Sequence, residues 1–172
     1  MKSSESDRAI QPGANFLRVR EARTPADVGQ VRQLFVEYQA AIGVDLCFQG
    51  FAEELASLPG HYARPAGCLL LAIDETAILG CIGLRPLRGS DCEMKRLYIR
   101  PAGRGRGLGR MLATAVIAEA RQAGYQRILL DTLPAMTDAQ ALYRSLGFAE
   151  LAPYYHNPIA GVLYFALTLR TA

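Results

Sequence analysis

The sequence of 172 residues lacks any apolar run approaching the roughly 20 residues that a membrane-spanning helix needs, so no membrane partner is expected. Its opening, MKSSESDRAIQPGAN, lacks the apolar stretch of a secretory signal. We expect residues 1–14 to form a flexible polar tail. Both absences favour a cytoplasmic protein.

Metal-binding and disulfide patterns are also missing. The cysteines, Cys47, Cys68, Cys81 and Cys92, show no CxxC spacing. Such spacing marks zinc sites and redox motifs, and disulfide frameworks belong mostly to oxidising compartments. We therefore expect reduced thiols and no bound metal.

Net positive charge is scarce outside one short segment. The chain carries a net charge of +3, and Arg100, Arg104, Arg106 and Arg110 supply four positive charges, so the remainder sums to −1. Nucleic-acid-binding domains usually carry a basic patch over a whole face. The distribution favours a local anion site and argues against a nucleic-acid partner.

Hydrophobic periodicity predicts a single domain over residues 15–172 with mixed α/β structure. Alternating apolar residues and turn signals predict strands over residues 17–22, 68–74, 77–85, 92–100, 127–133, 148–151 and 162–169. Apolar residues three and four positions apart predict helices over residues 24–43, 48–58, 107–123 and 137–147. This order predicts a mixed sheet with helices on both faces.

Two of the expected helices begin with capping signals. Thr24 precedes Pro25 and stands three residues before Asp27, which is typical of a capping box with proline at the first helical position. Thr137 and Gln140 have the same spacing, so we expect a second capping box there.

The segment IRPAGRGRGLGRML, residues 99–112, lies between an expected strand and an expected helix. It places glycine at alternate positions, Gly103, Gly105, Gly107 and Gly109. Glycine permits positive φ and lets backbone N–H groups approach a ligand closely. A helix start favours anions, and arginines add charge-assisted bonds. We interpret the segment as a phosphate-binding turn; solvated surface arginines are the alternative.

Two common phosphate-binding motifs do not fit this turn. The Walker A pattern needs lysine and a hydroxyl residue after its last glycine, where this chain has Arg110 and Met111. The Rossmann pattern G-x-G-x-x-G fails in every register. The pattern that remains is Arg104-x-x-Gly107-x-Gly109.

This pattern resembles the acetyl-coenzyme A (acetyl-CoA) binding motif R/Q-x-x-G-x-G/A of the GNAT superfamily of N-acetyltransferases. The segment ALYRSLGF, residues 141–148, resembles the family's A-x-x-L-Y-x-x-x-G-F segment. The element order from Leu17 to Leu169 is also similar to the GNAT fold. The resemblance implies a mostly antiparallel sheet of about seven strands, splayed between the fourth and fifth strands, with about four helices on its two faces.

The resemblance also implies acetyl-CoA as the cofactor. Its pyrophosphate is expected on backbone N–H groups from Arg104 to Arg110, and its pantetheine arm beside the strand that ends at Ile99. The expected cofactor-binding residues are Leu97, Tyr98, Ile99, Arg104, Gly105, Arg106, Gly107, Leu108, Gly109, Arg110, Ala139 and Tyr143.

Tyr143 and Glu93 are the candidate catalytic residues. Tyr143 resembles the family tyrosine that faces the coenzyme sulfur, and a phenol with a pKa of about 10 can protonate a departing thiolate. Its alternative is a core residue at helical spacing. Glu93 could deprotonate the amine and shares a strand face with Lys95, Leu97 and Ile99 unless a bulge intervenes. Its alternative is a surface carboxylate paired with a neighbour such as Lys95 or Arg96.

Three further positions bear on the site. Asp131 is another carboxylate, for which bonding to turn backbone is the alternative. His156 lies in a loop that borders the acceptor side in GNAT-like folds, where an exposed histidine is the favoured interpretation. Met136 stands where the family often has asparagine, so one contact with pantetheine is missing.

The sequence thus predicts acetyl transfer from acetyl-CoA to a primary amine of a small molecule or amino acid, by direct attack in a ternary complex. One alternative is a non-catalytic acyl-CoA-binding sensor or interaction module. Another is acetylation of a protein or peptide amine. A homodimer formed through the edge of the final strand is also possible on this pattern.

Overall fold

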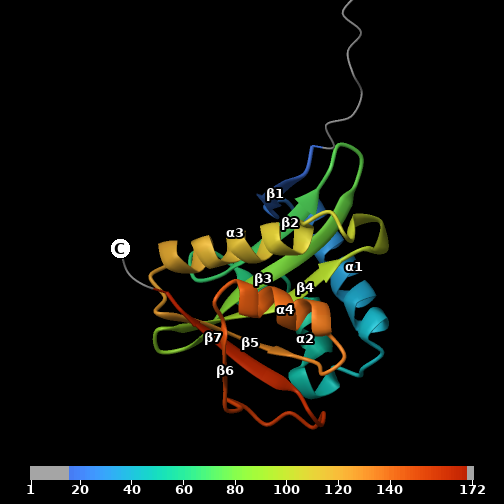
Figure 1. Cartoon of the computed structure of the whole chain (residues 1–172). Coiled ribbons are helices and arrows are strands. Elements are labelled where there is room, and N and C mark those ends of the chain that lie inside the picture. Colours follow the sequence, from blue (N-terminus) through green and yellow to red (C-terminus); the bar gives the residue numbers. More distant parts are fainter. Residues whose placement is uncertain (1–15, 170–172) are drawn as a thin grey trace, which may run out of the picture.

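The computed structural model describes residues 16–169 as a central sheet with helices on its two faces (Figure 1). The sheet has the order β1-β2-β3-β4-β5-β7-β6. Its strands are β1 (Arg18–Glu21), β2 (Cys68–Ile73), β3 (Ile78–Arg88), β4 (Asp91–Ile99), β5 (Arg127–Thr132), β6 (Ala149–Leu151) and β7 (Leu163–Thr168). The α-helices are α1 (Pro25–Ile42), α2 (Phe51–Ser57), α3 (Leu108–Gln122) and α4 (Thr137–Ser145). The expected fold is confirmed, whereas the expected tail, residues 1–14, lies outside the described residues.

Both faces of the sheet are covered, because the central strands are apolar on both sides. On β2, alternate residues from Cys68 to Ala72 join the core beneath α3, and those from Leu69 to Ile73 join the core beneath α1. Figure 1 shows α3 and α4 in front of the sheet and α1 and α2 on the other side. The sheet is therefore the middle of three layers.

β4 and β5 are parallel, whereas the other described strand pairs are antiparallel. Their pairing is confined to Asp91–Glu93 against Arg127–Leu129. Beyond this point the strands separate, although β4 continues to Ile99 and β5 to Thr132. Strand edges that separate leave backbone N–H and C=O groups in need of other partners. The expected splay is confirmed, and it opens the middle of the sheet to a ligand.

A β-bulge interrupts β4 at Arg96. The register passes from Gly83 opposite Lys95 to Cys81 opposite Tyr98, so β4 has one residue more than β3 between these pairs. Arg96 has a φ of +60°, in the left-handed region that costs an L-residue about 1–2 kcal/mol. Bulges often occur beside functional sites, where they redirect side chains.

The bulge changes the face on which the later residues of β4 lie. Leu97 and Ile99 pack into the same core as Met94, beneath α3. Glu93 and Lys95 point to the opposite face, because side chains alternate along a strand until the extra residue intervenes. The expected common face for these residues is therefore wrong beyond Lys95.

Two predicted local features differ in the structure. The capping box predicted at Thr137 is wrong, because Thr137 is the first residue of α4 and Met136 is its N-cap, without a side-chain hydrogen bond. The Gln140 amide instead donates to two carbonyl oxygens of the preceding turn, at 3.0 and 3.1 Å. The helix predicted over residues 48–58 is split into a 3₁₀ turn at Cys47–Gln49 and α2, because Gly50 adopts a φ of +68° between them.

α1 begins with the predicted capping box. The Thr24 hydroxyl accepts the Asp27 N–H, and the Asp27 carboxylate accepts the Thr24 N–H, both at 3.1 Å. Arg20 donates to the same carboxylate at 2.6 Å. The Arg20 hydrogen bond, opposed by burial and aided by the backbone N–H groups of Thr24 and Arg23, holds the pKa of Asp27 well below its ordinary value.

We expect Asp27→Asn to lower the free energy of unfolding by about 1 kcal/mol at pH 7, because it removes a charged cap and an ion pair. A carboxylate with a depressed folded pKa stabilises the fold above its unfolded pKa of about 4, and loses that contribution as the pH falls toward the folded pKa. Urea denaturation at pH 7 and pH 3 should show the difference between variant and wild type shrinking at pH 3. An equal difference at both pH values would contradict this assignment.

Within residues 16–169, no helix is long and apolar enough to cross a membrane. Cys47, Cys68, Cys81 and Cys92 are free thiols. Burial raises the pKa of Cys68 to about 12, so this thiol stays protonated at neutral pH.

Candidate functional site

The turn between β4 and α3 presents backbone donors at a helix start. Gly105 and Gly107 have φ angles of +72° and +78°, which glycine adopts at little cost. Gly107 is the N-cap of α3, and its carbonyl accepts the Met111 N–H at 3.1 Å. The N–H groups of residues 107–110 therefore precede the first helical hydrogen bond. Together with the helix dipole, they form a site suited to an anion.

Two of the four arginines around the turn are held by carboxylates. Arg100 donates to both carboxylate oxygens of Glu37, at 2.7 and 2.8 Å. Arg106 forms an ion pair with Asp74 at 3.1 Å. In this structure the charges of these two arginines are paired with acids of α1 and of the β2–β3 turn, and their binding of a phosphate stays a prediction.

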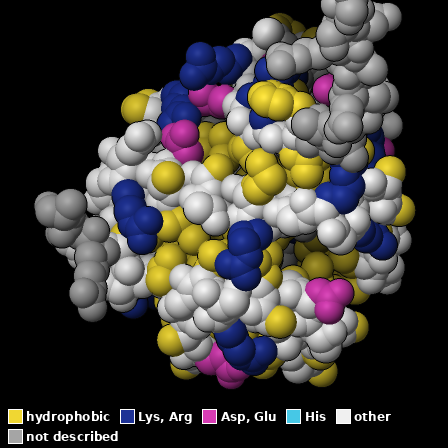
Figure 2. Space-filling model, turned by 45° about the horizontal axis from the view of Figure 1, so that its top comes forward, with side chains coloured by type: hydrophobic (Ala, Val, Ile, Leu, Met, Phe, Trp, Pro, Cys, Tyr) yellow, Lys and Arg dark blue, Asp and Glu magenta, His cyan; other side chains and the backbone are white. Residues whose placement is uncertain are grey.

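Arg104 and Arg110 have no acidic partner among the described residues. Arg104 donates to the Ile99 carbonyl at 3.2 Å, and Arg110 donates to the Ser145 hydroxyl at 2.7 Å. On the side of the molecule that Figure 2 displays, Lys and Arg side chains are interspersed with hydrophobic side chains. Arg104 and Arg110 are thus two cations beside the turn that no carboxylate of the described residues holds.

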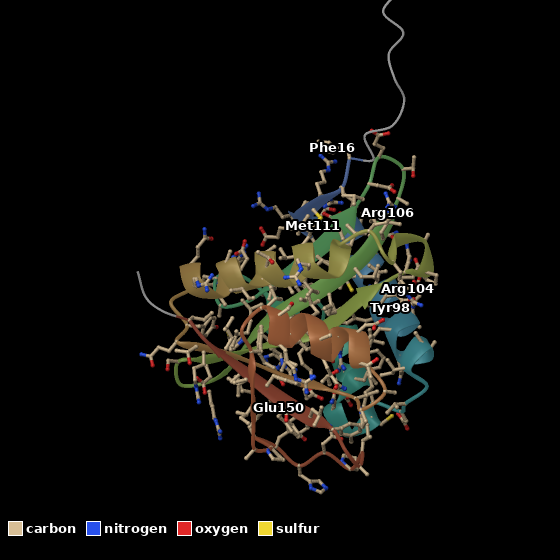
Figure 3. The ribbon with its side chains drawn as sticks, in the orientation of Figure 1. Phe16, Tyr98, Arg104, Arg106, Met111 and Glu150 are labelled. Carbon is tan, nitrogen blue, oxygen red and sulfur yellow. The ribbon has the colours of Figure 1, made fainter. Side chains whose placement is uncertain are left out.

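A groove of about 530 Å³ connects this turn with the start of α4. That volume lies within the usual range for small-molecule sites. The predicted cofactor-binding residues that line the groove are Leu97, Tyr98, Ile99, Arg104, Gly105, Gly107, Leu108, Gly109 and Ala139. Arg106 and Arg110 do not line it, and Figure 3 shows Arg106 away from Tyr98 and Arg104. The groove combines apolar walls with backbone donors at one end.

A narrower cavity of about 30 Å³ lies next to the groove, at the splay between β4 and β5. The residues common to both spaces are Tyr38, Ile42, Leu97, Leu133 and Met136. Of these two spaces, the inner cavity alone is lined by Lys95, Arg96, Asp131 and Tyr143. Polar and ionisable side chains thus meet the inner end of the apolar groove.

Tyr143 lies on α4, where it is only 5% exposed and packs its ring against Phe148 and Phe165. It also lines the inner cavity. Burial, with smaller contributions from Tyr38 and Asp131, raises the pKa of Tyr143 above its ordinary value. Tyr143 is thus a core residue and a cavity residue at once, and its hydroxyl remains protonated at neutral pH.

Asp131, on β5, links this strand to β4 through a hydrogen bond from Lys95. Its carboxylate accepts from Lys95 Nζ at 3.0 Å and from the Tyr155 hydroxyl at 2.9 Å. The alternative of bonding to turn backbone is therefore wrong, since its recorded partners are side chains. Burial opposes the charged form, but Lys95 and the Tyr155 hydroxyl outweigh it and hold the pKa of Asp131 below its ordinary value.

Glu93 is only 1% exposed, so the alternative of a surface carboxylate is wrong. It accepts from Arg85 Nε and Nη2 at 2.9 and 2.7 Å, and from the Tyr154 hydroxyl at 2.7 Å. Lys95 Nζ lies 3.7 Å from Oε1 of Glu93. Glu93 lines a second cavity, of about 220 Å³, on the same side of the sheet as Lys95. It does not line the cavity of Tyr143.

Arg96 is the site residue that sequence reasoning considered only as a possible partner of Glu93. Its guanidinium donates to both Glu54 oxygens at 2.6 and 3.2 Å and to Gln49 Oε1 at 2.9 Å. It also lies over the rings of Tyr38 and Phe51, at 5.8 and 5.1 Å from their centroids. No sequence pattern marks a β-bulge, and the bulge is what turns this side chain into the core.

The two histidines take no part in these spaces. Neither His61 nor His156 lines the groove or either cavity, and both are exposed. Among residues 16–169, no cluster of histidine, cysteine, aspartate or glutamate is arranged to hold a metal ion.

Comparison with known proteins adds a family match. Residues 31–148 match the model of the Acetyltransferase (GNAT) family. An uncharacterized N-acetyltransferase of Schizosaccharomyces pombe is 40% identical over 155 residues, which cover 89% of this chain and 95% of the relative. The uncharacterized N-acetyltransferase YjgM of Escherichia coli is 32% identical over 130 residues, which cover 74% of this chain and 77% of the relative.

Solved structures share the fold at lower identity. A GNAT-family acetyltransferase of Staphylococcus aureus superposes with a TM-score of 0.75 at 21% identity, over 90% of this chain and 100% of that chain. A protein of Salmonella typhimurium described as an acetyltransferase, and solved with its cofactor acetyl-CoA, gives a TM-score of 0.65 at 21% identity, over 91% and 95% of the two chains.

Proposed function

The chain belongs to the acetyltransferase (GNAT) family, and we propose that it moves an acetyl group from acetyl-CoA to a primary amine of a small molecule or amino acid. The observation that carries the proposal is that two adjacent spaces share wall residues. The groove beginning at the glycine turn and the cavity holding Tyr143 share Leu97 as a wall residue. One extended molecule can therefore reach both an anion site and a buried phenol.

The chain's residues fit such a molecule at each end. The N–H groups of residues 107–110 suit a diphosphate, and Arg104 adds a charge without an acidic partner among the described residues. Leu97, Ile99 and Ala139 line the middle of the groove and suit an apolar arm with few polar groups. The family uses acetyl-CoA, whose pyrophosphate and pantetheine arm have these properties.

The splay provides the reaction space. When bound, acetyl-CoA supplies a thioester as the acyl donor. Beyond Glu93, β4 has no strand partner on the β5 side. Backbone N–H groups near Leu97 and Ile99 can therefore polarise a carbonyl oxygen that gains charge. Holding two substrates side by side in this space supplies much of the rate.

Tyr143 is the proposed acid. Tyr143 lines the inner cavity, and its hydroxyl keeps its proton at neutral pH, because burial raises its pKa. With acetyl-CoA bound, this hydroxyl would donate its proton to the leaving sulfur. A phenol this buried is a weaker acid than one in water, so we expect transfer only once the sulfur has gained negative charge.

Two carboxylates are candidates for the base that accepts the amine's proton. Glu93, which the sequence predicts, already accepts bonds from Arg85 and Tyr154 and lies outside the cavity of Tyr143. Asp131 likewise accepts bonds, from Lys95 and Tyr155, but it lines that cavity. We propose that Asp131 takes the proton, directly or through water, and that Glu93 holds Lys95 and Tyr154 in place. Glu93 stays the alternative base.

Substitution at the two carboxylates separates these roles. We expect Asp131→Asn to lower kcat about tenfold at neutral pH, with a smaller loss for Glu93→Gln, because only Asp131 faces the phenol's cavity. Steady-state kinetics of both variants, with acetyl-CoA affinity measured alongside, tests this. A larger loss of kcat in Glu93→Gln would return the base role to Glu93.

A thiol-release assay tests the function as a whole. Acetyl-CoA is supplied with a panel of primary amines, and free coenzyme A is measured with a thiol reagent. Amine-dependent thiol release, with an acetylated amine found by mass spectrometry, is the expected result. Tight acetyl-CoA binding without transfer to any amine would instead support a non-catalytic acyl-CoA-binding module.

A further inference from the structure

The second cavity, which Glu93 and Lys95 line, is small and polar. It has a volume of about 220 Å³, which equals roughly seven water molecules at their liquid volume. Its walls are Gln49, Arg85, Leu87, Arg88, Glu93, Lys95, Tyr154 and Tyr155. A space of this size and composition suits a small polar molecule such as an amino acid.

Three of these wall residues are cations and one is a carboxylate. Arg85 neutralises Glu93 by two hydrogen bonds, yet its guanidinium has five N–H donors and uses only two on that carboxylate. Arg88 is exposed and forms no ion pair with the described residues. Its strand partner Asp91 is occupied by Arg127, at 2.6 and 2.9 Å. Lys95 is paired with Asp131 at 3.0 Å. Arg88 is therefore the wall cation without a carboxylate partner among the described residues, and it is free to bind an anion.

The charges are arranged along the length of β4. Arg88 lies opposite Asp91 at the hairpin end, and Lys95 lies four residues further along. Four residues of strand span about 13 Å. The long side chain of Arg88 can cover part of this distance. The inner end adjoins Tyr155, whose hydroxyl contacts Asp131. The cavity thus has the cation Arg88 at its outer end. At its inner end, the wall residue Tyr155 donates a hydrogen bond to the Asp131 carboxylate.

We propose that the acceptor is a small primary amine that also carries a carboxylate. Arg88 and the remaining donors of Arg85 bind the carboxylate. The amine lies at the inner end, where this cavity shares the wall residues Gln49 and Lys95 with the cavity of Tyr143 and Asp131. This inference rests on the proposed function, which it makes more specific. A polyamine would meet repulsion from the unpaired Arg88, and an apolar amine would find Leu87 as the one aliphatic wall residue.

Matched pairs of acceptors provide the test. The panel contains the common L-amino acids, β-alanine and γ-aminobutyrate, each beside its carboxamide, which keeps the amine and removes the negative charge. Acetyl transfer is measured by thiol release. Binding is measured independently of turnover, by saturation-transfer NMR in the presence of coenzyme A. Carboxylate acceptors are expected to have kcat/KM values at least tenfold above those of their carboxamides.

Charge reversal at Arg88 tests whether this cavity causes the preference for carboxylate acceptors over carboxamides. We expect Arg88→Glu to raise KM for carboxylate acceptors about tenfold or more, leaving the carboxamides nearly unchanged, because a charge-assisted bond becomes a repulsion. The effect should weaken at high salt. Arg121→Glu, which alters an exposed arginine of α3 outside these spaces, makes the same change in net charge and should leave KM unaffected.

The outcomes separate this inference from the proposed function. Transfer to carboxamides as good as transfer to amino acids, or unchanged KM in Arg88→Glu, would overturn the inference and leave the acetyltransferase intact. Binding of amino acids that depends on Arg88 without any acetyl transfer would support the inference and remove the proposed function. Neither transfer nor binding across the panel would overturn both.

Discussion

Replacing Gly107 by glutamate is expected to weaken acetyl-CoA binding about 100-fold, since binding would lose charge-assisted hydrogen bonds to the phosphates. Gly107 is the N-cap of α3 with a φ of +78°. A glutamate there brings a carboxylate to the place where the helix N–H groups would meet phosphate. Because a carboxylate at a helix start favours the helix itself, the loss should appear in binding more than in folding.

The opposite end of the same helix offers a matched control. Gly124 follows α3 with a φ of +81°, and a Cβ at either glycine would meet open space. Glutamate at either position therefore carries a similar backbone strain, about 1–2 kcal/mol for an L-residue in the left-handed region. Gly124 does not line the groove. Gly124→Glu is thus expected to lose stability and keep its affinity for acetyl-CoA.

Isothermal titration with acetyl-CoA measures the affinity, and urea denaturation measures the strain. Unchanged affinity in Gly107→Glu would remove the turn from the cofactor site. Equal loss of affinity in Gly124→Glu would show that strain in α3, and not the anion site, was responsible. Arg104→Glu should give a smaller loss, of about tenfold, because one exposed charge contributes less than a set of aligned backbone donors.

The glycine turn shows what the sequence can predict. Alternate glycines between a strand and a helix have a local meaning, because positive φ and free N–H groups depend on residues close in the chain. The start and end of α1 were likewise predictable, from Thr24 and Asp27 and from Gly43, which ends the helix with a φ of +64°. Such features need no knowledge of distant partners.

The arginines of the turn show what the local sequence does not predict, namely which of their charges are paired with carboxylates. Arg100 and Arg106 look equivalent to Arg104 and Arg110 in the sequence. Glu37, however, lies 63 residues from Arg100 along the chain and is brought beside it by the packing of α1. Which charge remains available is decided by tertiary contacts, which the sequence pattern of the turn does not contain.

The positions of the two candidate carboxylates, Glu93 and Asp131, could not be predicted from the sequence. They depend on a β-bulge and on a strand pairing. One extra residue at Arg96 places Leu97 on the opposite face from Glu93, so strict alternation assigns the wrong neighbours. Asp131 is brought toward Lys95 by a parallel pairing between segments 36 residues apart. The family resemblance pointed to the glycine turn at one end of the groove, whereas the contacts of Asp131 and Glu93 required the structure.

Tyr143→Phe is expected to lower kcat by about 100-fold or more, the usual contribution of a positioned acid, with acetyl-CoA affinity unchanged. The substitution removes one hydroxyl and retains the ring contacts with Phe148 and Phe165. Tyr125→Phe is a fitting control, because its hydroxyl donates to the Ala66 carbonyl at 2.7 Å, away from the groove. Turnover equal to wild type in Tyr143→Phe would leave Tyr143 a core residue only.

The pH dependence sharpens the same prediction. The acid acts in its protonated form, and burial raises the pKa of Tyr143 above the value of about 10 for a free phenol. The wild-type rate should therefore show no loss from ionisation of this group as the pH rises through 9. A rate that falls between pH 8 and pH 9, in the wild type and not in Tyr143→Phe, would mean that the phenol ionises there. Such a phenol could not hold its proton for the leaving sulfur, and the acid role would have to pass to another donor.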